Sequence, residues 1–160
     1  NCFPLLEVVD ISDPVYFKDN QVEYVTLTFF KLRKVNLSGL DYIAELLFRL
    51  FKNCPLLEEV ILLRCYDIAY DGVSSALREA PRLTSLTFST GYGPVDEEDR
   101  ESYITSQFIA SLVSLKYLTS LDLLSTKISD ELLFSIANEG LPLTRLVLQA
   151  LGGYSYSGIF

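Results

Sequence analysis

The hexapeptide Leu83-Thr84-Ser85-Leu86-Thr87-Phe88 (LTSLTF) shows the pattern that decides the fold of this chain. Its large apolar residues stand at positions one, four and six, and five other hexapeptides carry Leu, Val, Ile or Phe at these positions. The six copies are LEVVDI from Leu6, LRKVNL from Leu32, LEEVIL from Leu57, LTSLTF from Leu83, LTSLDL from Leu118 and LTRLVL from Leu143. They begin 26, 25, 26, 35 and 25 residues apart, so a repeat of 25–26 residues runs through the chain.

Each repeat unit predicts a strand, a turn, a helix and a second turn. A proline stands one or two residues before four of the hexapeptides, where it ends a preceding helix; these prolines are Pro4, Pro55, Pro81 and Pro142. Between hexapeptides, apolar residues recur mostly at steps of three and four, which predicts helices; they lie at 40–51, 104–115 and 132–137. Asp71, Ser129 and Asp130 are candidate helix N-caps, and Gly140 is a candidate helix stop.

Similar strands at this spacing stack in parallel, and no single unit buries its leucine face alone. We therefore predict an α/β fold, a leucine-rich-repeat solenoid of about six repeats of 25–26 residues, with parallel strands on the concave face and helices on the convex face. A single domain is expected over residues 1–160. The end units should expose apolar surface or a strand edge. The chain contains no Met and opens on Asn1-Cys2-Phe3-Pro4, similar to Asn53-Cys54-Pro55, so we expect a fragment of a longer parent.

The one long interval, 35 residues, predicts an insertion near 91–101. It contains Gly91-Tyr92-Gly93-Pro94, followed at 96–101 by five acidic residues and one arginine. Insertions in repeat proteins become loops on one face, so we expect a protruding acidic loop. A recognition element is one alternative. Another is a small-molecule pocket near this loop, with Tyr92 and Tyr103 as walls.

Composition argues against several classes of function. The net charge of −8 and the scattered basic residues disfavour a nucleic-acid partner. No apolar run approaches the roughly 20 residues of a membrane span, so no membrane contact is expected. Three cysteines without any histidine complete no zinc site. The absence of histidine also leaves Ser155, in the near-motif Gly153-Tyr154-Ser155-Tyr156-Ser157, without its usual base. We predict no catalytic residue, no metal and no cofactor.

A binding surface is the function class that remains. If the apolar positions face inward, the opposite face carries positions three and five of each hexapeptide. It also carries the residue that directly follows the hexapeptide, which we count as position seven. Most of these residues are small and polar, whereas Ile61, Leu63, Leu124 and Val147 are apolar and indicate a protein-binding patch. The candidate partner-binding residues are Lys34, Glu59, Ile61, Leu63, Arg64, Asp122, Leu124, Arg145 and Val147.

Two segments give the repeats a more specific likeness. Cys65-Tyr66-Asp67-Ile68-Ala69-Tyr70-Asp71-Gly72-Val73 resembles the cysteine-containing subtype of leucine-rich repeat, and the stretch from Leu118 to Leu146 resembles repeats of plant F-box/leucine-rich-repeat proteins. The resemblance implies a substrate-recognition repeat region of an F-box-type ubiquitin ligase receptor. The sparse cysteines favour a reducing compartment, cytoplasmic or nuclear. The alternative is a stand-alone or secreted leucine-rich-repeat inhibitor or ligand-binding protein, for which the sequon Asn36-Leu37-Ser38 is the one hint.

Overall fold

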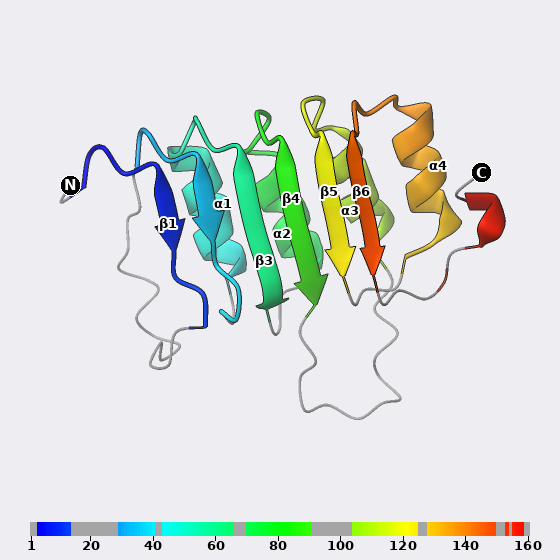
Figure 1. Ribbon diagram of the computed structural model, residues 1–160, viewed down its shortest axis with the longest axis horizontal. Helices are drawn as coiled ribbons and strands as arrows, with labels where there is room; N and C mark the ends of the chain where they lie inside the picture. The colour runs from blue at the N-terminus through cyan, green and yellow to red at the C-terminus, as the bar shows by residue number, and fades with distance from the viewer. Residues whose placement is uncertain are drawn as a thin grey trace.

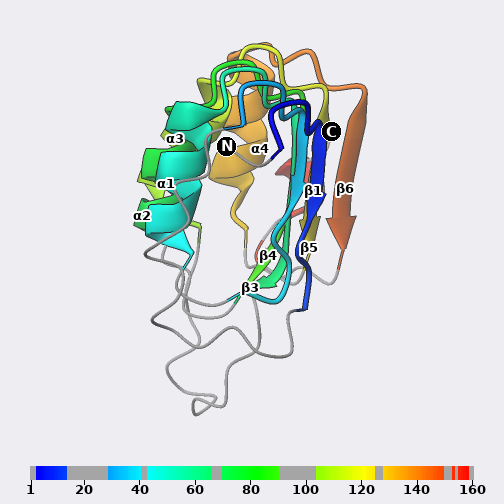
Figure 2. The same cartoon turned by 90° about the vertical axis from the view of Figure 1, so that its left-hand side faces the viewer.

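Six parallel strands form one sheet in chain order, β1-β2-β3-β4-β5-β6, and the helices cover one side of it (Figures 1 and 2). This computed structural model describes residues 3–13, 29–40, 43–65, 70–90, 104–124, 128–149, 153 and 155–158. The elements are β1 (Val8–Asp10), β2 (Lys34–Asn36), α1 (Ala44–Asn53), β3 (Glu59–Cys65), α2 (Tyr70–Leu77), β4 (Ser85–Thr90), α3 (Ser106–Val113), β5 (Ser120–Leu124), α4 (Asp130–Asn138), β6 (Arg145–Gln149) and the 3₁₀ helix η3 (Tyr156–Gly158).

The strand register joins equivalent hexapeptide positions of successive units. Position four, for example, forms one row across the sheet: Val9, Val35, Val60, Leu86, Leu121 and Leu146. The four middle members of this row have no exposed surface. The prediction of an α/β fold with parallel strands is thereby confirmed, and the arrangement is compatible with a solenoid.

The core lies between the sheet and the helices. Positions one, four and six of the middle units point into it, as the hexapeptide pattern predicts, and the helices contribute their apolar faces. An aromatic cluster occupies its centre, where the ring of Phe108 lies 5.4 Å from Tyr70 and 5.5 Å from Phe88 between centroids. These three rings come from three different elements, so they join α2, α3 and β4 at one point of the core.

A ladder of hydrogen bonds joins neighbouring units just before each strand begins. The carbonyl of Thr84 accepts the backbone N–H groups of Thr119 and Ser120, and the same pattern recurs at each junction from Glu7 to Thr144. Three threonine hydroxyls add to it: Thr84 donates to Glu58 O at 3.0 Å, Thr119 to Thr84 O at 3.1 Å and Thr144 to Thr119 O at 3.2 Å. The threonine at position two therefore binds its unit to the preceding one.

The helix ends follow the sequence signals only in part. Gly140 has φ +61° just after α4, which confirms the helix stop, because a left-handed residue there favours glycine. The N-cap assignments of Asp71 and Asp130 are wrong, since both lie inside the first turn of their helices. An acid in the first turn still interacts favourably with the helix dipole, which explains the signal. Ser129 does precede α4, but its side chain makes no capping hydrogen bond. Among the described residues, no helix has the length and apolar character needed to cross a membrane.

Candidate functional site

The side of the sheet opposite the helices, which we name the open face, carries the alternate residues of the strands (Figure 2). The burial of β3 alternates between half-buried and buried from Glu59 to Leu63, and β5 does the same from Ser120 to Leu124. The half-buried members point away from the core, so positions three, five and seven of these units share the open face. Eight of the nine candidate partner-binding residues occupy such positions, and Arg64 directly follows Leu63.

The four apolar candidate residues of the open face form two pairs and not one patch, and Val8, at position three of the first hexapeptide, is a further exposed apolar residue. Ile61 and Leu63 both lie on β3, whereas Leu124 lies on β5 and Val147 on β6. All four are half-buried. Between the pairs runs β4, whose Thr87 faces Ile61 on one side and Asp122 on the other. The centre of the face is therefore a strip of hydroxyl side chains flanked by aliphatic ones.

Charged side chains on the open face bind one another across neighbouring strands. Lys34 Nζ donates to Glu59 Oε1 at 2.7 Å, from β2 to β3. Arg145 donates twice to the carboxylate of Asp122, at 3.0 and 2.9 Å, from β6 to β5. Hydrogen bonding from Arg145 to Asp122, and the charge of that carboxylate, raise the pKa of the guanidinium. These four charges are therefore partly neutralised within the protein.

A β-bulge contains Arg64, near the carboxyl-terminal end of β3. The register with β4 shifts between Leu62 and Cys65, and Arg64 has φ +53°. Its N–H donates to Ser89 Oγ at 2.9 Å, and its guanidinium donates to Asp13 Oδ2 at 2.6 Å. The extra residue turns Cys65 into the core, where it is 1% exposed and its thiol donates to Leu37 O at 3.5 Å.

Asp10 and Asn36 form a polar corner that sequence reasoning did not select as a binding site. Asp10 Oδ1 accepts hydrogen bonds from the N–H and the hydroxyl of Ser12. Asn36 Oδ1 accepts the same two bonds from Ser38. Asn36 Nδ2 also donates to Asp10 Oδ2 at 3.1 Å. Bonds from Ser12 and Asn36 lower the pKa of Asp10. The signal available in the sequence was the repeated Asp-x-Ser and Asn-x-Ser spacing. The asparagine of the sequon therefore lies in this hydrogen-bonded corner, where one N–H of its amide is bound to Asp10.

Three further features of the sequence are Ser155, the possible metal ligands and the acidic insertion. The Ser155 hydroxyl donates to Asp130 Oδ2 at 2.5 Å, so this serine is bound to the side chain of the first residue of α4. Within the described ranges, no group of three or more His, Cys, Asp or Glu side chains is placed to hold a metal ion. The acidic insertion at 91–101 and the proposed walls Tyr92 and Tyr103 lie outside the described residues.

Comparison with protein-family models and with curated protein sequences finds no match to this chain. The function of the chain is therefore inferred from its repeat pattern and from the geometry of the open face.

Proposed function

We propose that this chain is a protein-interaction module, a leucine-rich-repeat solenoid whose open face binds another protein. The observation that carries the proposal is the half-buried state of Ile61, Leu63, Leu124 and Val147 on a face that no described helix covers. Aliphatic side chains are otherwise concentrated on the helix-covered side of the sheet. A partner that covered the open face would remove their remaining surface from water, at about 25 cal/mol per Å².

The charge arrangement indicates what kind of contact this face makes. Because Lys34 is bound to Glu59 and Arg145 to Asp122, a partner gains little by offering either charge alone. The strip between the two aliphatic pairs offers hydroxyl donors and acceptors, among them Ser85, Thr87 and Ser120. We therefore expect a neutral, partly apolar partner surface, and binding that depends weakly on salt.

The area of the open face limits how much surface a partner can bury on it. Six strands about 4.8 Å apart and about five residues long cover roughly 24 by 17 Å, or about 400 Å². A standard interface buries about 800 Å² on each partner. The open face thus supplies about half of such an interface, and a stable partner would extend beyond it onto an edge of the sheet.

The more specific proposal is the substrate-recognition repeat region of an F-box-type ubiquitin ligase receptor, acting in the cytoplasm or nucleus. It is supported by the likeness to plant F-box/leucine-rich-repeat proteins, in whose cysteine-containing repeats a Cys follows the strand, as Cys65 does here at the end of β3. In this proposal the chain is not an enzyme. It holds a protein substrate while other subunits carry out the transfer of ubiquitin.

A capture experiment tests the proposal. The chain serves as bait in a native plant extract, beside the double variant Ile61→Asp, Leu63→Asp and the control Phe134→Asp. Phe134 is an apolar residue on α4 that is already 50% exposed, so it matches the chemical change away from the open face. We expect partners to be lost with the double variant, kept with Phe134→Asp and retained in about 0.5 M salt. Circular dichroism confirms that each variant is folded. Retention of every partner by the folded double variant would refute the proposal.

A further inference from the structure

A second surface lies along the edge where helices turn into strands, at the top of Figure 1, which we name the turn edge. Among the described residues, seven large apolar side chains are exposed, and four belong to this edge. They are Phe3 (63%), Leu5 (69%), Phe30 (61%) and Tyr117 (64%). Phe3, Leu5 and Phe30 belong to the first two units and Tyr117 to the fifth, and exposed aromatic residues are typical of protein-binding surfaces.

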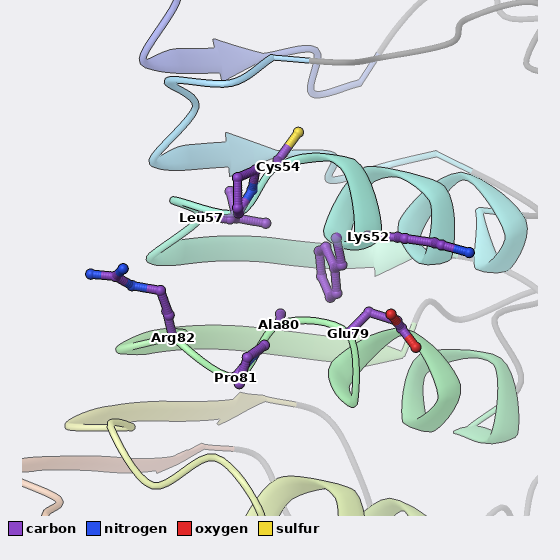
Figure 3. Close-up of a pocket in the computed structure, with 9 residues that line it drawn as sticks. Lys52, Cys54, Leu57, Glu79, Ala80, Pro81 and Arg82 are labelled. Carbon is purple, nitrogen blue, oxygen red and sulfur yellow. The ribbon is translucent and has the colours of Figure 1, made fainter.

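Two neighbouring hollows open on the turn edge and share one residue, Arg82. The first, of about 440 Å³, is lined by Glu58, Arg82, Thr84 and Tyr117. The second, of about 340 Å³, has apolar walls that include Pro55, Leu57 and Pro81 (Figure 3). Since the walls come from consecutive units, the two hollows lie side by side along the edge with Arg82 between them.

Arg82 forms no ion pair with an acid among the described residues, a state that it shares with Lys31 on the same edge and with Lys52 of the second hollow. Arg33 forms an ion pair with Glu58 of the following unit, and Lys116 forms one with Glu139 at 3.0 Å. In the unit that follows Arg82, Tyr117 stands at the equivalent position. Figure 3 shows the Arg82 side chain pointing away from Glu79, the acid that lines the second hollow.

We propose that the turn edge around Arg82 binds an extended segment of a partner protein in which an acidic side chain lies beside apolar ones. A carboxylate accepts two parallel hydrogen bonds from a guanidinium, which Arg82 has available. Apolar side chains two residues before and two residues after that acid enter the hollows, against the Tyr117 ring on one side and Pro55 and Pro81 on the other. Alternate residues of an extended chain point to the same side and are about 6.6 Å apart, so the acid and these two apolar side chains all face the edge. Arg and Tyr are also the residues that most often dominate interface energies.

A titration with defined peptides tests this inference independently of the open face. The probe is acetyl-Leu-Ala-Asp-Ala-Leu-amide, its control is acetyl-Leu-Ala-Asn-Ala-Leu-amide, and backbone amide shifts of the ¹⁵N-labelled chain report binding. We expect saturable shifts at Thr84 and Tyr117 with the Asp peptide, and a Kd about tenfold weaker with the Asn peptide or with Arg82→Gln, which corresponds to losing about 1.4 kcal/mol.

The matched protein control is Arg49→Gln, because Arg49 is an exposed arginine on α1 that already binds Glu45 at 2.7 Å. We expect it to bind the Asp peptide as the parent chain does. Equal affinity of Arg82→Gln, shifts confined to the open face, or the same shifts with acetate alone would each overturn the inference. Shifts with acetate alone would show that the turn edge binds any carboxylate and does not recognise the apolar residues of a peptide segment.

Discussion

Leu121 and Leu146 stand at the same hexapeptide position in adjacent strands and are paired in register, yet one is 0% and the other 43% exposed. The difference comes from what lies on each side. β5 is flanked by β4 and β6, whereas β6 ends the sheet of the described residues. The other apolar positions agree: Leu118 and Leu123 are fully buried, while Leu143 and Leu148 are only partly so.

The difference between Leu121 and Leu146 shows that leucine side chains are buried by contact between neighbouring units. A unit with a neighbour on one side buries only part of its leucine face, whatever its sequence, as expected where each unit contacts only its neighbours. The segment at 155–158 makes its contact with α4, where Asp130 accepts the N–H and hydroxyl of Ser155.

Truncating the two leucines should give the largest contrast. Leu121→Ala leaves a cavity between two units and should cost about 2–5 kcal/mol of unfolding free energy. Leu146→Ala removes atoms that are already partly in water and should cost about 1 kcal/mol. Urea denaturation followed by circular dichroism measures both. Equal costs would mean that burial between units is not what stabilises this chain.

The threonine ladder offers a smaller contrast between the same two junctions. Thr119→Val removes the hydroxyl that donates to Thr84 O from a half-buried position, and should cost about 1 kcal/mol. Thr144 donates to Thr119 O from an exposed position, where water replaces the bond, so Thr144→Val should cost less than about 0.5 kcal/mol. The same denaturation experiment ranks them, and a reversed order would show that these hydroxyls do not join the units.

The repeat made most of the fold predictable. Apolar residues at positions one, four and six require a strand with one buried side, and equal spacing requires neighbouring strands in register, as Val60 and Leu86 show. The helix starts were less predictable, because Asp71 and Asp130 suit either a cap or a first turn. The exposure of Leu146 follows from its place at the sheet end, which its own hexapeptide does not reveal.

The candidate site was predictable as a face but not as a set of contacts. Alternation assigned Ile61 and Leu124 to one side of the sheet, and the register then places the hydroxyls of β4 between their strands. The ion pair of Arg64 with Asp13 joins residues 51 apart and depends on a bulge, for which no local pattern gave a signal. The hollows beside Arg82 are lined by residues of successive units, such as Glu58 and Tyr117, and no pattern within one unit predicts how these turns pack together.

The smallest expected effect is a pH dependence at the C-terminal end of the described chain. Hydrogen bonds from Ser155 lower the pKa of Asp130 below its ordinary value of 3.8. The unfolded chain therefore binds a proton more readily than the folded one, so this contact stabilises the chain above about pH 3.8 and is lost as the pH falls through the lower, folded value. Hydrogen exchange at the Ser155 amide should accelerate over that interval, relative to its intrinsic rate, and the acceleration should be absent in Asp130→Asn. Asp10, whose pKa is lowered chiefly by Ser12, supplies the comparison near the other end, since Asp130→Asn should leave exchange at the Ser12 amide unchanged. If Asp130→Asn changed hydrogen exchange at both the Ser155 and the Ser12 amides, the two ends of the chain would unfold as one cooperative unit. The difference in stability between inner and outer units would then not apply to these two contacts.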